Sequence, residues 1–218
     1  MNNATVSVSR GGLFSKVALL LTGSMCLSAL GTYVGAGITS LAAIIALAIA
    51  FLAGAFIVPL AAKSSKEAGL VALAGWTFIS GLFLGPTINH YVAVLGWSTV
   101  FLSFLGTGGV MAACGAIGAL SGRDFSKMGW WLTIALLGLI VVGIFNIFVA
   151  FSTGVEIVYC LIGIAIFAGF FIFDFFRLSK ADDNWFNAIT GTMEIYLDFI
   201  NVLLYLLRLI AALTGKRD

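Results

Sequence analysis

Seven long apolar segments limit how this chain can fold more than any other feature of its sequence. Each reaches about 20 residues or more, which is the length an α-helix needs to cross the roughly 30 Å hydrocarbon core of a bilayer. Backbone polar groups in lipid must pair within their own segment, so helices are expected rather than an open sheet. The predicted spans are residues 14–37, 41–62, 68–90, 97–120, 128–150, 155–178 and 187–212.

The composition agrees with a membrane protein. Of the 218 residues, 61% are hydrophobic and 9% are charged, whereas soluble domains carry about 25% charged residues. Short connections make consecutive helices antiparallel neighbours. The sequence therefore predicts an all-α membrane protein with a single domain over residues 1–218, a seven-transmembrane-helix bundle whose C-terminal helix is central. The net charge of +2 is spread over segment ends, so no nucleic-acid partner is expected.

Small residues are expected to shape the packing of these helices. The pairs Gly31-xxx-Gly35 and Gly81-xxx-Gly85 each place two glycines one turn apart, which lets helix backbones approach closely. They are interpreted as packing contacts.

The cysteines are also interpreted as packing residues. Cys26, Cys114 and Cys160 each lie singly in an apolar run and lack the spacing of a metal site or a redox pair. No cofactor is expected.

Lysine and arginine in the short loops predict the orientation. The loops near 38–40, 91–96 and 151–154 contain neither residue, whereas the loops on the other side of the membrane are basic. Since basic loops face the cytoplasm, a cytoplasmic N-terminus is expected. The expected location is a bacterial inner (plasma) membrane, in which the protein is multi-pass. Lys216 and Arg217 conflict with this orientation, because seven spans place them outside, unless the last helix does not cross fully. The basic residues on the cytoplasmic side are Arg10, Lys16, Lys63, Lys66, Arg123, Lys127, Arg177 and Lys180.

Two acidic residues lie inside apolar helices near the end of the chain. Asp174 is part of Gly169-Phe-Phe-Ile-Phe-Asp-Phe-Phe176, and Asp198 is part of Ile195-Tyr-Leu-Asp-Phe-Ile-Asn201. An ionised carboxylate in such a place costs roughly 2.5–3.5 kcal/mol on insertion scales. The pair predicts an ion or proton site in which each acid is the partner of the other.

The predicted topology allows the two acids to meet in the inner half of the bundle. Asp174 lies about one turn from the cytoplasmic end of the sixth span, and Asp198 lies about 12–18 Å into the seventh. Two carboxylates in a dry site cannot easily both ionise, so they titrate as a unit and can act as a proton switch. When ionised, they offer hard oxygen ligands to calcium. The alternative is a purely structural role for both acids, satisfied by local hydrogen bonds.

Other charged residues lie near this pair. Glu194 precedes Asp198 by four residues and shares its helical face, unless it extends to the cytoplasmic interface. Lys63 ends the second span level with Asp174. Arg177 follows Asp174 by three residues and is either its partner or a contact for lipid headgroups.

Several polar residues have simpler interpretations. Asn146 and Asn201 are expected to form interhelical hydrogen bonds. His90 is interpreted as an interfacial residue at the outer end of the third span, with an outer proton sensor as the alternative. Glu156 is interpreted as an interfacial acid, and Arg208 as the marker of the outer end of the seventh span.

With these segments, the chain resembles the transmembrane Bax-inhibitor-motif family of small seven-helix membrane proteins. The match is specific over roughly residues 142–210 and weaker before residue 75. The segments that carry it are Val142-Gly-Ile-Phe-Asn-Ile-Phe148, Phe173-Asp174, Ile195-Tyr-Leu-Asp-Phe-Ile-Asn201, Leu206-Leu-Arg208, Ser80-Gly81 through Pro86, and Asn89-His90-Tyr91.

This resemblance implies a pH-sensitive calcium leak. Asp174 and Asp198 correspond to the pH-sensing pair of bacterial members and would hold calcium transiently. Lys63 occupies the place of a basic latch that closes the pore, where family members often have arginine; lysine lacks the bidentate fork. Glu194 is a second departure, which could widen the cation site. The expected partners are calcium ions, protons and the lipid bilayer, with other membrane proteins as a further option.

Other functions were weighed against this one. An intramembrane aspartyl protease needs Gly-x-Gly-Asp at its second acid, whereas this chain has Tyr196-Leu197-Asp198, so no enzyme is expected. Two alternatives stay open: a non-conducting regulator that binds other membrane proteins, such as a protease or stress-response modulator, and a proton-coupled cation exchanger.

Overall fold

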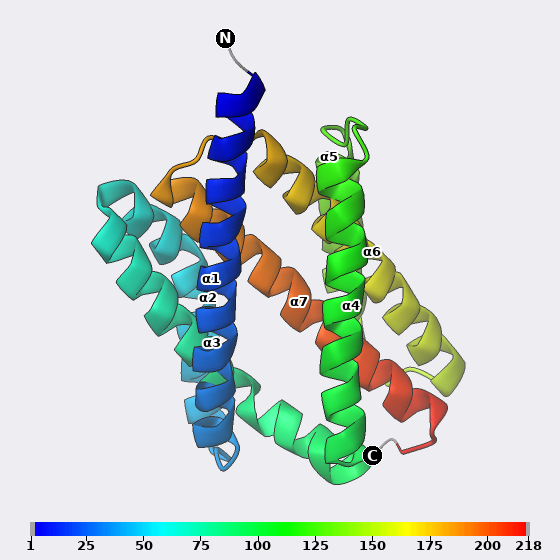
Figure 1. Ribbon diagram of the computed structural model, residues 1–218. Coiled ribbons are helices and arrows are strands. Elements are labelled where there is room, and N and C mark those ends of the chain that lie inside the picture. Colours follow the sequence, from blue (N-terminus) through cyan, green and yellow to red (C-terminus); the bar gives the residue numbers. More distant parts are fainter. Residues whose placement is uncertain (1–2, 217–218) are drawn as a thin grey trace. The chain divides into compact units, whose positions relative to one another are not determined.

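The computed structural model describes residues 3–216, with side chains from residue 12 onward except that of Ile147. Within them, each helix is long and apolar enough to cross a membrane, which confirms the all-α, seven-span prediction. The side chain of Arg10, predicted to be cytoplasmic, and residue Arg217, predicted to be outside, are not among the parts that the structure describes. The helices are α1 (Asn3–Gly35), α2 (Leu41–Ser64), α3 (Lys66–Leu95), α4 (Trp97–Leu120), α5 (Met128–Phe148), α6 (Thr153–Lys180) and α7 (Trp185–Leu213) (Figure 1).

Two helix ends differ clearly from the prediction: α1 begins at Asn3 rather than 14, and α3 ends later than predicted. Helix α3 continues to Leu95 instead of ending at 90, so the predicted loop at 91–96 is wrong. The residues after His90 are all compatible with a helix, and the break comes at Gly96, whose φ of 88° is a conformation that favours glycine. His90 therefore lies inside α3, more than a turn before its end.

The chain divides into two compact units that share α7. The first comprises residues up to 90 together with 180–196, and the second comprises 91–179 together with 197 onward. Of the most apolar window of α7, 61% is buried, against 11% for α2 and 6% for α5. The high buried fraction of α7 confirms the prediction of a central C-terminal helix.

Glycines bring α1 and α3 into backbone contact in the first unit. A methyl group on Gly81 would collide with the carbonyl oxygen of Ser28, and one on Gly85 would collide with the backbone of Gly35. Gly31 faces the backbone of α3 in the same way. The predicted role of the two glycine pairs in helix packing is confirmed.

Trp76 holds α2 against α3. Its indole nitrogen donates a hydrogen bond of 2.9 Å to the carbonyl oxygen of Phe51, and its ring stacks on the ring of Phe51 at a centroid distance of 5.4 Å. Gly54 leaves the space that the indole fills. The buried N–H is thus paired, as a tryptophan in an apolar environment requires.

The second unit uses the same principle around α6. A side chain on Gly118 of α4 would meet the carbonyl oxygen of Ile172, and one on Gly163 of α6 would meet the ring of Tyr205 on α7. Glycines on one helix therefore leave room for the backbone or an aromatic ring of a neighbouring helix.

We expect Gly81→Ala to destabilise the protein by about 1–3 kcal/mol, because the added methyl group has no space against the α1 backbone. Gly75→Ala, on the same helix, is the control: nothing lies near its added methyl group, so it should be neutral or stabilising by up to about 1 kcal/mol. Thermal unfolding in detergent measures both, and equal melting temperatures would contradict the contact.

Candidate functional site

The two acids singled out in the sequence are both buried. Asp174 on α6 is 7% exposed and Asp198 on α7 is 5% exposed. Both belong to the second compact unit and both lie within helices long and apolar enough to cross a membrane. Two acidic groups are thus withdrawn from solvent on consecutive helices of one unit.

Contacts between α6 and α7 define how these helices pair. Glu156 near the start of α6 forms an ion pair with Arg208 near the end of α7, and the hydroxyl oxygens of Tyr159 and Tyr205 are 3.2 Å apart. The rings of Phe167 and Tyr205 lie with centroids 6.0 Å apart. The helices therefore run antiparallel in contact.

Extending this register brings the acids to the same level. Asp174 follows Phe167 by about two helical turns, and Asp198 precedes Tyr205 by about two turns, which is roughly 10 Å along each axis. Two turns return a side chain to nearly the same helical face. We infer that Asp174 and Asp198 lie at one level on the facing sides of α6 and α7.

Arg177 is the cationic neighbour of Asp174. Its Nη1 lies 3.6 Å from Oδ1 of Asp174, while the guanidinium side chain is 51% exposed. The same guanidinium lies over the ring of Phe173 at 5.5 Å. An ion pair with so exposed a partner stabilises little, but it places a positive charge beside one member of the pair.

The other predicted members of the site have different positions. Lys63 is exposed, and its Nζ lies 5.9 Å from the ring centroid of Phe186, in the first unit; the latch to Asp174 stays a prediction. Glu194 is partly buried and lies one turn before Asp198 on α7, as predicted from the spacing.

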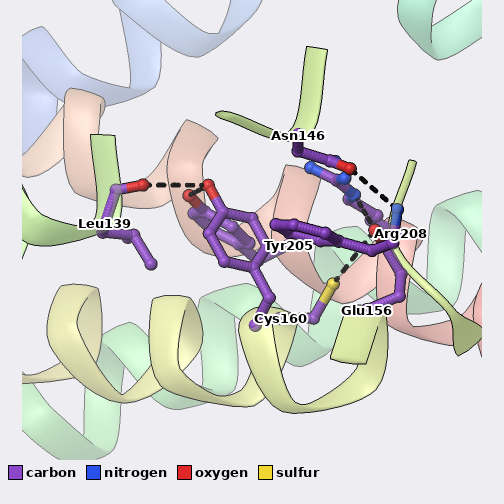
Figure 2. A network of polar contacts seen from close by, with 8 residues as sticks. Leu139, Asn146, Glu156, Cys160, Tyr205 and Arg208 are labelled. Atoms are coloured by element: carbon purple, nitrogen blue, oxygen red, sulfur yellow. Dashed lines mark hydrogen bonds and ion pairs between the residues drawn. The ribbon is translucent and has the colours of Figure 1, made fainter. Parts of the chain in front are cut away.

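That Glu156 is an interfacial acid stays a prediction, but the structure gives this residue, in the first turn of α6, a partner that the sequence analysis did not foresee. Glu156 is 2% exposed and is held by Arg208 (Figure 2). The sulfur of Cys160 lies 4.0 Å from its Oε1. Arg208 lies in the last third of α7, which ends at Leu213; that it marks the outer end of the span stays a prediction.

The sequence contained a signal for this pair. Opposite charges at the start of one helix and near the end of the next become level when the two helices pair antiparallel. A buried carboxylate requires such a partner, because an isolated charge in a dry environment is too costly.

Two tyrosines extend the polar contacts around this ion pair. Tyr159 donates to the carbonyl oxygen of Leu139 on α5 over 3.2 Å, so the hydrogen between the two phenols comes from Tyr205. Figure 2 shows Tyr205 close to Glu156 and Cys160. Polar groups of α5, α6 and α7 thus satisfy one another in this part of the second unit.

The asparagines do not form the predicted interhelical bonds. The Nδ2 of Asn201 donates to Leu197 of its own helix over 2.8 Å. The Oδ1 of Asn146 accepts from the backbone N–H of Phe151 over 3.1 Å, which closes the connection between α5 and α6. Both asparagines satisfy local backbone groups instead.

Asp174 and Asp198 by themselves offer few ligands for a metal ion. In the part of the chain that the structure describes, no group of three or more His, Cys, Asp or Glu side chains gathers that could hold a metal ion. Calcium takes about six to eight oxygen ligands, so Asp174 and Asp198 could supply only part of its coordination.

Comparisons with known proteins give the same assignment over most of the chain. Residues 10–215 match the family described as "Inhibitor of apoptosis-promoting Bax1". The protein YrjE of Lactococcus lactis, described as uncharacterized, is 30% identical over 239 aligned positions that cover 100% of this chain and 99% of its own. An uncharacterized membrane protein of Vibrio cholerae is 33% identical over 74% of this chain and 70% of its own. One of Streptococcus pyogenes serotype M1 is 28% identical over 81% of this chain and 74% of its own.

We expect removal of one partner of the Glu156–Arg208 pair to destabilise the fold. Glu156→Ala should cost about 3 kcal/mol, at the lower end for buried pairs, since the Arg208 side chain is 33% exposed. The double variant Glu156→Leu with Arg208→Leu should regain much of this loss, because no buried charge is left alone.

The exposed Glu67 supplies the matched control, and Glu67→Ala should leave the melting temperature in detergent nearly unchanged. A Glu156→Ala variant as stable as wild type would show that the pair contributes nothing to the fold.

Proposed function

Because this chain belongs to the Bax-inhibitor family of multi-pass membrane proteins, we propose that it is a calcium leak channel whose conductance depends on pH. The observation that carries this proposal is the burial of Asp174 and Asp198 on α6 and α7. Carboxylic acids inside membrane spans mark ion or proton pathways. In this proposal calcium ions and protons are the species that the protein handles, and no catalysis is involved.

The acid pair provides a physical basis for gating. Two carboxylates at one level in a dry site interact strongly, so their protons are gained and lost as a coupled unit. Each proton changes the charge of the site and turns an acceptor oxygen into a donor. An ionised pair attracts a divalent cation, whereas a protonated pair offers it neither charge nor strong ligands. Glu194, one turn away on α7, would add to the negative charge.

We also propose that the starts of α1, α3 and α7 lie on the cytoplasmic side of a bacterial inner membrane. Lys16 donates a 2.7 Å charged hydrogen bond to Asp183, before α7. Its Nζ and that of Lys66 lie 5.2 and 4.2 Å from the ring centroid of Trp185. These lysines thus gather at one end of the first unit, where the positive-inside rule and interfacial tryptophan expect them.

Calcium flux into proteoliposomes, measured from about pH 6 to about pH 8, tests the channel. We expect wild type to show a pH-dependent flux, and Asp174→Asn and Asp198→Asn each to remove most of the pH dependence, because an amide does not titrate. Asp182→Asn, at an exposed position between α6 and α7, is the matched control and should behave as wild type.

The same assay separates the alternatives. Folded wild type without calcium flux at any pH would contradict the channel and favour a non-conducting regulator of other membrane proteins. A calcium flux that stops whenever proton flow is prevented would identify an exchanger instead.

The latch implied by the family resemblance makes a separate prediction for Lys63. If its ammonium group closes the pore, Lys63→Gln should raise calcium flux several-fold at the pH where wild type is least conductive. Lys66→Gln, an exposed lysine three residues later, controls for lost surface charge. Equal flux in wild type and Lys63→Gln would remove Lys63 from the gate.

A further inference from the structure

The start of α7 carries two aromatic rings that lie next to lysines from three other helices. The Nζ of Lys16 on α1 and that of Lys66 on α3 lie 5.2 and 4.2 Å from the ring centroid of Trp185. The Nζ of Lys63 on α2 lies 5.9 Å from the ring centroid of Phe186. All five residues belong to the first compact unit. Three ammonium groups therefore gather at the first turn of α7, each within the range of a cation–π contact.

An acid neutralises one of these lysines. Lys16 donates a 2.7 Å hydrogen bond to the carboxylate of Asp183. A side chain at Gly12 would collide with that carboxylate, so the ion pair lies directly against α1. In the part of the chain that the structure describes, no ion pair involves Lys63 or Lys66. These two lysines therefore bring positive charge to this end of the unit that no carboxylate among the described residues offsets by direct contact.

Lys63 and Lys66 are both accessible to a ligand. Lys63 lies in the last turn of α2, Lys66 is the first residue of α3, and both are exposed. An ammonium group has three N–H donors, so one that lies over a ring can still bond the oxygen of an anion. Glu67 follows Lys66 directly but lies about 100° further round α3. The two lysines can therefore receive an anion at the junction of α2 and α3.

An apolar stripe runs along α2 from this junction. It consists of Leu52, Phe56 and Leu60, which precede Lys63 at helical spacings of four or three residues and share its face. The three side chains are 62, 75 and 64% exposed. From residue 52 to residue 63 the helix rises about 16 Å, which is about half of the roughly 30 Å hydrocarbon core. A charged end followed by an apolar stripe of this length matches a phospholipid of one leaflet.

We propose that Lys63 and Lys66 bind the phosphate group of an anionic phospholipid, whose acyl chain lies along the apolar stripe of α2. Basic residues between membrane helices on the cytoplasmic side are suited to acidic headgroups. The negative phosphodiester complements the two ammonium groups, and the apolar stripe favours a lipid over a soluble anion. The rings at the start of α7 hold the lysines in place. This binding does not require that the protein conduct calcium.

Native mass spectrometry of the full-length protein in detergent, with phosphatidylglycerol added, tests this site. We expect Lys63→Gln and Lys66→Gln each to weaken binding about fivefold and the double variant to weaken it about 30-fold, as expected for basic residues next to an anionic lipid. Phosphatidylcholine, which carries no net charge, should bind wild type more weakly and should not distinguish the variants. The single variants keep the test valid if the double variant does not fold.

Arg123→Gln with Lys127→Gln is the matched control. Both residues are exposed in the connection between α4 and α5, and the variant loses the same charge as the double lysine variant. It should bind phosphatidylglycerol nearly as wild type does. An equal loss of binding in the two double variants would show a general attraction between basic loops and acidic lipid, and would overturn the site.

Two further measurements separate a lipid from a soluble anion. Phe56→Ala shortens a side chain of the apolar stripe and should weaken the binding of phosphatidylglycerol; unchanged binding would contradict the place of the acyl chain. Inorganic phosphate should not displace the lipid at equal concentration, and if it does, the lipid assignment is wrong. Lysine-dependent lipid binding by a protein that conducts no calcium would support this site while the channel proposal fails alone.

Discussion

The cost of burying charge in a low-dielectric environment is the constraint on which the arrangement of α6 and α7 depends. Three acids on these helices, Glu156, Asp174 and Asp198, are each less than a tenth exposed. Such groups are tolerated only where partners or other polar groups face them. The antiparallel contact of the two helices supplies such a partner for Glu156, which it pairs with Arg208.

The two compact units bury different kinds of polar group. In the first, the phenol of Tyr196 and two serines bond across helices, and neutral hydroxyls fix geometry without a response to pH in the physiological range. In the second, the carboxyl groups of Glu156, Asp174 and Asp198 are buried.

Hydropathy was sufficient for the spans but not for every boundary. The bounds of α4 (Trp97–Leu120) match the prediction, since apolar character changes sharply at both ends. The end of α3 was missed because residues 91–95 are compatible with both a helix and a loop, and the break depends on the backbone conformation of Gly96. The glycine pairs were recognised because close helix contact leaves a short local pattern.

The sequence by itself determined seven membrane-spanning helices, the family, and the presence of acids in the last two spans, because apolar length and local motifs do not depend on how helices are rotated. Only the tertiary structure decided which polar groups meet. The Glu156–Arg208 pair, the bond of Asn201 to its own helix and the serine partners of Tyr196 depend on the register and rotation of each helix. Side-chain packing between helices sets these quantities, and the hydropathy of a segment does not encode them.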